Sequence, residues 1–251
     1  MSDATTVFGL HAVRTLLQRH ASKVAQLFVQ RGREDARINE VLKLAHEQGI
    51  KVEQRSSQEL DQLTQGASHQ GVIAQLRKID NLGEGALDDV LDKAGNNPLV
   101  LVLDGVTDPH NLGACMRTAD AAGVHAVIVP RDRAAGLSPV VRKVAAGAAE
   151  TVPLIQVTNL ARTLRWLKER GLWLVGTDDE ATQSIYTAKL TGPMAIVMGA
   201  EGGGMRRLTK ENCDLLVNIP MSGVVESLNV SVATGVTLFE VVRQRVAVPN
   251  K

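Results

Sequence analysis

The chain has 251 residues, enough for one large domain or two smaller ones that each bury a core. Its apolar content of 44% excludes extensive disorder, its net charge of +1 gives no support for unspecific binding to nucleic acid, and its aromatic content of 2% argues against base-stacking platforms. Two distant cysteines, no apolar run of about 18 residues and no secretory pattern predict a cytoplasmic protein without a membrane span.

Residues 1–80 show the pattern of a small α/β domain. Apolar positions recur at helical spacing in three segments, and short apolar runs lie between them. The predicted elements are helices over 9–19, 36–48 and 57–64, and strands over 24–29, 50–53 and 71–77. Ser56 and Glu59 have the spacing of a capping box in front of the third helix.

A change in composition marks a boundary near residue 97. All eight prolines lie at or after Pro98. Residues 81–97 are rich in Gly and Asn and carry four acidic residues against Lys93. We interpret 81–97 as a linker with one helical turn at 87–93, and 98–251 as a second domain.

The second domain alternates strand and helix patterns, which predicts a mostly parallel α/β sheet. Strands are expected at 99–103, 124–129, 152–157, 172–176, 194–198 and 215–219, and helices at 111–122, 138–146, 159–170 and 228–245. Ligands of such sheets bind beyond the carboxyl ends of the strands. The loops that follow three of the strands are therefore the places to look for chemistry.

The first of these loops runs from Asp104 to Arg117 and reads DGVTDPHNLGACMR. Pro109 fixes its own φ and moves Asp108 out of the helical region, which predicts a tight turn into a helix. One interpretation is an ordinary capped turn with Asn111 as the N-cap. The alternative is that Asn111 and Arg117 reach a polar substrate.

The second loop, Gly199–Met205, reads GAEGGGM. Its glycines let the backbone approach a ligand closely, but the spacing fits neither a dinucleotide fingerprint nor a phosphate loop. Glu201 is either a solvated turn residue or a group of the site.

The third loop, Ile219–Ser231, reads IPMSGVVESLNVS. Ser227 is a good N-cap for the final helix. The functional alternative is that backbone groups of 219–228 hold a purine-bearing cofactor, with Ser227 and Asn229 organising the polar site.

Other reactive residues receive structural interpretations. His110 has no Cys or His partner nearby in sequence, so no metal site is predicted. Cys115 lies on an apolar helical face and is expected in the core, and Cys213 is expected to be structural. No nucleophile elbow is present.

Together the three loops resemble the SpoU/TrmH-type RNA ribose 2′-O-methyltransferases. The matching stretches are DGVTDPHNLGACMRTADAAG (104–123), VMGAEGGGM (197–205) and IPMSGVVESLNVSVATG (219–235). The first 80 residues are similar to the L30e-like substrate-binding domain of one branch. HQGVIAQ (69–75), GVHAVIVP (123–130) and KVAAGAAETVPLI (143–155) resemble the branch that methylates a guanosine in the peptidyl-transferase P-loop of 23S rRNA.

The resemblance implies a SPOUT α/β fold with a deep trefoil knot, S-adenosylmethionine as cofactor, 23S rRNA as partner and a homodimer built through the C-terminal domain. It implies that Arg117 is catalytic, with Asn111, Glu201, Ser227 and Asn229 completing the polar site. Gly199, Ile219 and Leu228 are then cofactor contacts. Because a guanidinium stays protonated, Arg117 is expected to stabilise the developing alkoxide and to grip phosphate.

Two positions depart from the family pattern. Gly203 stands where relatives often have an acidic residue, and Glu226 stands where small polar residues are common. Neither removes a predicted site residue, but both change the charge near RNA. Methylation of tRNA and a non-catalytic role in ribosome assembly are the alternatives, whereas a nicotinamide oxidoreductase lacks its glycine fingerprint.

Overall fold

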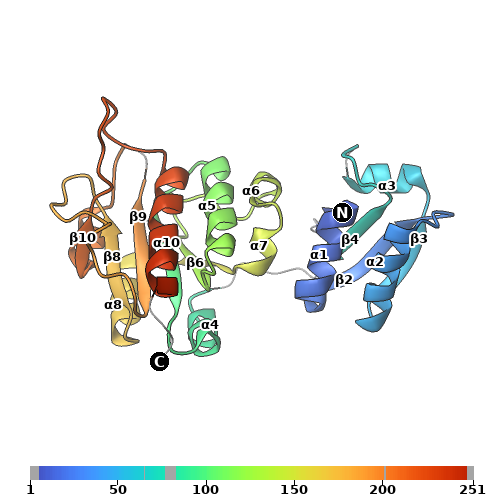
Figure 1. Ribbon diagram of the computed structural model, residues 1–251, viewed down its shortest axis with the longest axis horizontal. Helices are drawn as coiled ribbons and strands as arrows, with labels where there is room; N and C mark the ends of the chain where they lie inside the picture. The colour runs from blue at the N-terminus through green and yellow to red at the C-terminus, as the bar shows by residue number, and fades with distance from the viewer. Residues whose placement is uncertain (1–5, 65, 77–82, 201, 248–251) are drawn as a thin grey trace. The chain divides into compact units, whose positions relative to one another are not determined.

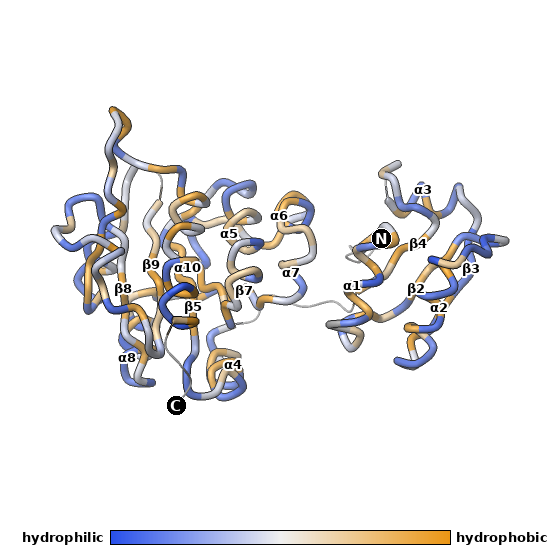
Figure 2. Tube along the Cα trace, in the orientation of Figure 1, coloured by the Kyte–Doolittle hydropathy of each residue, from blue (hydrophilic) through white to orange (hydrophobic). Residues whose placement is uncertain are grey.

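A computed structural model describes residues 6–64, 66–76, 83–200 and 202–247 of the chain. The chain divides into two compact units, Met1–Asp80 and Asn81–Lys251 (Figure 1). Each unit has its own sheet and its own apolar core, seen as hydrophobic stretches along the inner strands (Figure 2). Within the described residues, no helix is both long and apolar enough to cross a membrane.

The described part of the first unit holds a four-stranded sheet in the order β1-β4-β2-β3. Only β2 and β3 are parallel, and the other neighbours are antiparallel. Its elements are β1 (Thr6–Phe8), α1 (Leu10–His20), a short 3-10 turn (Ala21–Lys23), β2 (Val24–Gln30), α2 (Ala36–Glu47), β3 (Lys51–Arg55), α3 (Ser57–Thr64) and β4 (Val72–Leu76). The predicted elements are confirmed, and β1 is additional: three half-buried residues are too few to give a periodic pattern.

Helices cover both faces of this sheet. On one face, α1 and α2 pack Val13, Leu17, Ile38 and Val41 against strand residues such as Leu27. On the other face, Leu60 of α3 packs against Phe28 and Ile73. The alternation of strand side chains between the two faces gives each helix a surface to cover.

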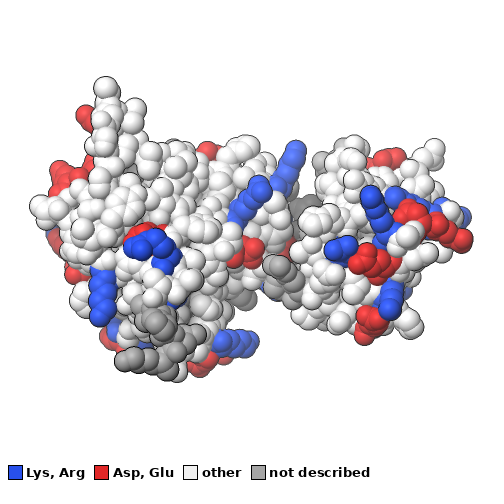
Figure 3. All heavy atoms as spheres, in the orientation of Figure 1, with Lys and Arg blue, Asp and Glu red and all other residues white. Residues whose placement is uncertain are grey.

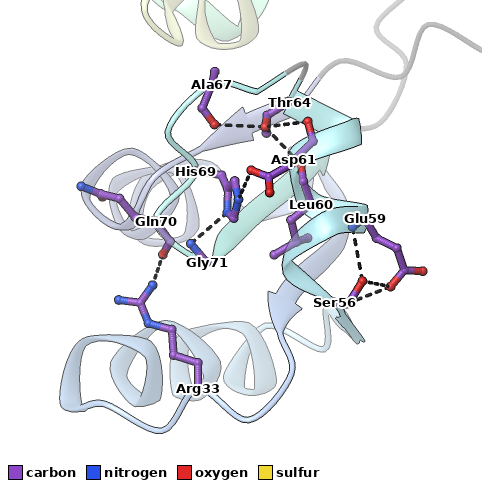
Figure 4. A network of polar contacts seen from close by, with 10 residues as sticks. All are labelled: Arg33, Ser56, Glu59, Leu60, Asp61, Thr64, Ala67, His69, Gln70 and Gly71. Carbon is purple, nitrogen blue, oxygen red and sulfur yellow. Dashed lines mark hydrogen bonds and ion pairs between the residues drawn. The ribbon is translucent and has the colours of Figure 1, made fainter.

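The predicted capping box is confirmed at the start of α3. The Ser56 N–H and hydroxyl donate to Glu59 Oε2 at 2.8 and 2.9 Å, and the Glu59 N–H donates to Ser56 Oγ at 3.3 Å (Figure 4). These hydrogen bonds from Ser56, together with one from Arg55, lower the pKa of Glu59 to about 2. The carboxylate is therefore held in its charged form by the fold.

Glu59→Gln is expected to make the first unit less sensitive to acid. A carboxylate with a lowered pKa in the folded state stabilises fully above its ordinary pKa of 4.5, and this stabilisation is lost as the pH falls towards 2. Thermal unfolding followed by circular dichroism across this range measures the slope. Glu34→Gln is the matched control, because Glu34 is exposed and has no hydrogen bond or ion pair to any described residue. Equal slopes for both variants and the unmodified chain would contradict the expectation.

The turn between α3 and β4 is held by a buried histidine. His69 Nδ1 accepts the Gly71 N–H at 3.0 Å, which leaves Nε2 to donate to Asp61 Oδ1 at 3.1 Å (Figure 4). Gln70 between them has a φ of 48°, and its carbonyl accepts a hydrogen bond from Arg33. The histidine ring thus joins the helix to the start of the strand.

The second unit holds a six-stranded sheet among its described residues, in the order β10-β8-β9-β5-β6-β7. The predicted parallel sheet is confirmed, since every strand pair runs parallel. The strands are β5 (Leu99–Asp104), β6 (Ala126–Pro130), β7 (Leu154–Val157), β8 (Trp173–Thr177), β9 (Met194–Gly199) and β10 (Leu215–Val217). The trefoil knot stays a prediction.

Helices cover this sheet on both faces. Leu101 of β5 faces a core shared with α5, α6, α7 and α10, whereas its neighbour Val102 faces a core shared with α4 and α8. The helices are α4 (Ala86–Ala94), α5 (Pro109–Ala121), α6 (Pro139–Ala145), α7 (Ala148–Thr151), α8 (Leu160–Glu169), α9 (Arg207–Asn212) and α10 (Val230–Ala247). A strand buried on both faces explains the uninterrupted apolar run of β5.

The prediction that residues 81–97 form a linker needs a correction. Residues 86–94 form the helix α4, whose Leu87 and Leu91 are buried against the sheet of the second unit. Glu84 accepts hydrogen bonds from the backbone N–H and the hydroxyl of Thr158, both at 2.8 Å. The two leucines are one helical turn apart, so the high charge of the segment belongs to the solvent face of an amphipathic helix.

Candidate functional site

A pocket of about 490 Å³ opens at the carboxyl ends of the strands of the second unit. A pocket of this size suits a small-molecule ligand. It brings together four residues that the sequence placed in the site: Gly199, Ile219, Ser227 and Leu228. Its other lining residues come from the same loops, from the ends of β8 and β9, from α9 and from the first turn of α10: Thr177, Asp178, Asp179, Glu180, Met198, Ala200, Gly202, Gly203, Gly204, Met205, Lys210, Met221, Glu226, Val230 and Ala233.

The glycine loop after β9 folds back on itself. Ala200 and Gly204 exchange two backbone hydrogen bonds of 3.0 Å. A Cβ on Gly199 would lie 2.3 Å from the carbonyl carbon of Gly204, so only glycine fits there. Glu201, a predicted site residue, lies outside the described residues.

Two of the predicted polar residues meet across α5 and α10. Asn229 Nδ2 donates to Asn111 Oδ1 at 3.1 Å. Asn229 Oδ1 in turn accepts the backbone N–H of Ser231 at 2.9 Å and its hydroxyl at 2.6 Å. The flanking residues Leu228 and Val230 both line the pocket, so the asparagine pair lies at its border.

The two N-caps differ from the expectations. Asp108 caps α5 by accepting the His110 N–H at 2.9 Å, which puts Asn111 inside the first turn. At α10, Asn229 rather than Ser227 has the hydrogen bond of a cap, because the helix starts at Val230. Ser227 is exposed and lines the pocket, so the structure uses it at the site and not as the cap of α10.

Arg117 contributes nothing to the lining of the pocket. Its side chain is exposed on α5. No hydrogen bond or ion pair joins its guanidinium to any described residue. As far as the described residues are concerned, its donors are open to a ligand that arrives from solvent.

The sequence reasoning missed the acidic wall of the pocket. Asp178, Asp179 and Glu180 follow β8 and line the pocket together with Glu226. Acidic side chains gather over this end of the unit, near β8 and β10 (Figure 3). Lys210 lies among them, with Nζ 2.7 Å from Asp178 Oδ2, and its hydrogen bonds to Asp178 and Glu180 raise its pKa. Four carboxylates against one ammonium favour a ligand that carries positive charge.

The remaining reactive groups are structural. Cys115 is fully buried, as expected. Burial raises the pKa of the Cys213 thiol to about 12, so this thiol is a poor nucleophile. In the part of the chain that the structure describes, no three His, Cys, Asp or Glu side chains are grouped so that they could hold a metal ion.

Comparison with known families identifies both units. Residues 98–239 match the model of the SpoU rRNA Methylase family, and residues 6–82 match the RNA 2′-O ribose methyltransferase substrate-binding family. The chain is 57% identical to the 23S rRNA (guanosine-2′-O-)-methyltransferase RlmB of Pseudomonas putida, over 98% of each chain. It is 58% identical to the protein of the same name from Haemophilus influenzae, over 95% of this chain and 97% of the other.

Solved structures show the same fold. The SpoU methyltransferase AviRb from Streptomyces viridochromogenes, in complex with the cofactor AdoMet, superposes with a TM-score of 0.76 at 24% identity, over 97% of this chain and 91% of the other. An RNA 2′-O ribose methyltransferase superposes with a TM-score of 0.68 at 27% identity, over 96% and 88%.

Proposed function

Because the chain belongs to the SpoU rRNA methylase family, we propose that it transfers a methyl group from S-adenosylmethionine to the 2′-hydroxyl of a guanosine in 23S rRNA. The observation that carries this proposal is the identity of 57% over nearly the full length of a 23S rRNA (guanosine-2′-O-)-methyltransferase. The pocket supports it, since it collects Gly199, Ile219 and Leu228 at the strand ends. The P-loop of 23S rRNA is the proposed region of the target.

The residues of the pocket fit the proposed cofactor. S-adenosylmethionine supplies an electrophilic methyl group on a positively charged sulfur. Ile219, Leu228 and Met221 offer apolar surface for a purine ring, and the glycine loop offers backbone groups at close range. The carboxylates of Asp178, Asp179, Glu180 and Glu226 complement a cation.

The protein's part in the reaction is to position and activate the hydroxyl. A ribose hydroxyl is barely ionised at neutral pH, so rate enhancement comes from alignment and from stabilising the developing alkoxide. The Arg117 guanidinium, exposed and unpaired among the described residues, is proposed to contact the hydroxyl oxygen and an RNA phosphate. The Asn111–Asn229 pair is proposed to orient the ribose at the border of the pocket.

A homodimer is proposed from the outer face of α10. Val232 and Phe239 are half-exposed and Val246 is 79% exposed, and the three are spaced seven residues apart. Residues at this spacing lie on one stripe of a helix. An exposed apolar stripe of this kind is typical of a protein–protein contact.

We place the protein in the cytoplasm, where ribosomal RNA is processed in bacteria.

Transfer of tritium from labelled S-adenosylmethionine to RNA tests the function. We expect the protein to label a 23S rRNA transcript of the peptidyl-transferase region and to leave tRNA unlabelled. Ribose-methylation mapping should find the methyl group on one guanosine. Labelling of tRNA alone would favour the tRNA alternative. Cofactor binding below detection by calorimetry would favour a non-catalytic RNA-binding protein.

A further inference from the structure

A buried carboxylate lies beside the pocket and takes no part in the function described above. Asp104 ends β5, and its side chain has an exposure of 0%. The Arg206 backbone N–H donates to Oδ2 at 2.9 Å, and Arg206 Nε donates to Oδ1 at 2.6 Å. A terminal guanidinium nitrogen of the same arginine also contacts Oδ1. One residue therefore supplies both a backbone and a side-chain donor to this carboxylate.

This ion pair joins the two ends of the glycine loop. Asp104 lies in register with Gly199, the residue at which the loop leaves β9. Arg206 follows Met205, the last residue of the loop, and occupies the N-cap position of α9. The loop between them, Gly199–Met205, lines the pocket at each of its described residues. The pair thus fixes, relative to β5, the point where the loop leaves β9 and the point where it enters α9.

The loop needs such a constraint because of its composition. Gly202, Gly203 and Gly204 stand in succession, and Gly202 and Gly204 have positive φ angles of 70° and 59°. Glycine loses more conformational freedom on ordering than other residues, so a free glycine loop would have to be ordered by the ligand at a cost in affinity. The Asp104–Arg206 pair joins the two ends of this loop in the absence of any ligand. Breaking the pair also leaves a buried carboxylate without its cation, which is costly.

From this geometry we infer that Asp104 and Arg206 are positioning residues for the cofactor. They hold Gly199–Met205 in the conformation that forms one wall of the pocket, and Arg206 acts through the loop because it does not itself line the pocket. The inference rests on the proposed function for the identity of the ligand. It does not rest on it for the order of the loop, which is measured without any ligand.

The first test compares cofactor binding by three variants. Arg206→Ala is expected to weaken S-adenosylmethionine binding by about tenfold or more in calorimetry, because a charge-assisted contact is lost and the loop must be ordered by the cofactor. Methyl transfer at saturating cofactor should change by about twofold at most, so KM rises while kcat is nearly kept. Arg206→Lys should recover part of the affinity, since an ammonium keeps the charge but not the fork. Arg207→Ala is the matched control, because Arg207 is 80% exposed and pairs with Glu211 on its own helix.

The second test measures the loop without ligand. Hydrogen exchange of the Ala200 and Gly204 amides, which pair with each other, should be faster in Arg206→Ala than in the unmodified chain. Exchange in β5 and β9 upstream of the loop should stay the same. Asp104→Asn should show the same acceleration in the loop, to a smaller degree, because an amide oxygen still accepts a hydrogen bond from Arg206.

The outcomes separate the two proposals. If the unmodified chain binds no S-adenosylmethionine, the proposed function fails, while the exchange experiment still decides the order of the loop. If the unmodified chain binds the cofactor and Arg206→Ala binds it equally well with unchanged exchange, the positioning role is wrong. It is also wrong if the affinity falls only in step with a loss of folded protein in thermal unfolding.

Discussion

Arg117→Ala should reduce methyl transfer by at least about a thousandfold, the scale seen when a group that stabilises developing charge is removed. Binding of S-adenosylmethionine should be unchanged, because Arg117 does not line the pocket. Single-turnover assays on cognate rRNA, beside calorimetry with the cofactor, measure the two effects separately. The expected pattern is a lost kcat with an intact affinity for the cofactor.

Two further variants make this result specific. Arg117→Lys should also be poor, because a single ammonium cannot contact oxygen and phosphate with the planar fork of a guanidinium. Arg165→Ala should be fully active: Arg165 is an exposed arginine on α8, on the opposite face of the sheet, and no described residue pairs with it. Near-normal turnover of Arg117→Ala would remove this residue from the reaction.

The position of the pocket at the carboxyl edge of the second sheet could be predicted from local sequence. A strand that is apolar throughout, such as β5, must be covered on both faces, and parallel strands bring their following loops to one edge. The residues Gly199, Ile219 and Leu228 therefore meet in one pocket although they lie in two loops. The capping box of Ser56 and Glu59 is equally local and was predictable for the same reason.

Contacts between distant segments were not predictable in this way. The ion pair of Asp104 and Arg206 joins residues 102 positions apart, and neither loop alone signals it. The acidic wall at Asp178 depends on which strands lie beside β8 in the sheet. The sequence pattern of β8 does not predict this neighbourhood. The sequence predicts a linker with one helical turn at 87–93 rather than a packed helix, because Leu87 and Leu91 are the only two leucines of its apolar face and span a single turn. Arg117 stays a prediction from resemblance, since the structure places it outside the pocket.

Phe239→Asp is expected to convert the proposed dimer into monomers. Phe239 lies in the middle of the outer stripe of α10, between Val232 and Val246, and is 49% exposed in the single chain. Val242, on the same helix, is less exposed than Phe239 in the single chain and is therefore a poorer place for this test. A charge buried without a partner costs several kcal/mol, which shifts a dimer equilibrium by about a hundredfold or more. Light scattering at micromolar concentration measures the change in mass.

A matched control separates the stripe from exposed aromatic surface in general. Tyr186 is 53% exposed and lies outside α10, so Tyr186→Asp should leave the mass unchanged. The residues Val230 and Ala233 on the inner side of α10 line the pocket, so loss of the dimer should also weaken cofactor binding. Phe239→Asp should therefore lower mass and affinity together, whereas Arg206→Ala should lower affinity alone. An unmodified chain that binds the cofactor as a monomer at micromolar concentration would show that α10 needs no partner.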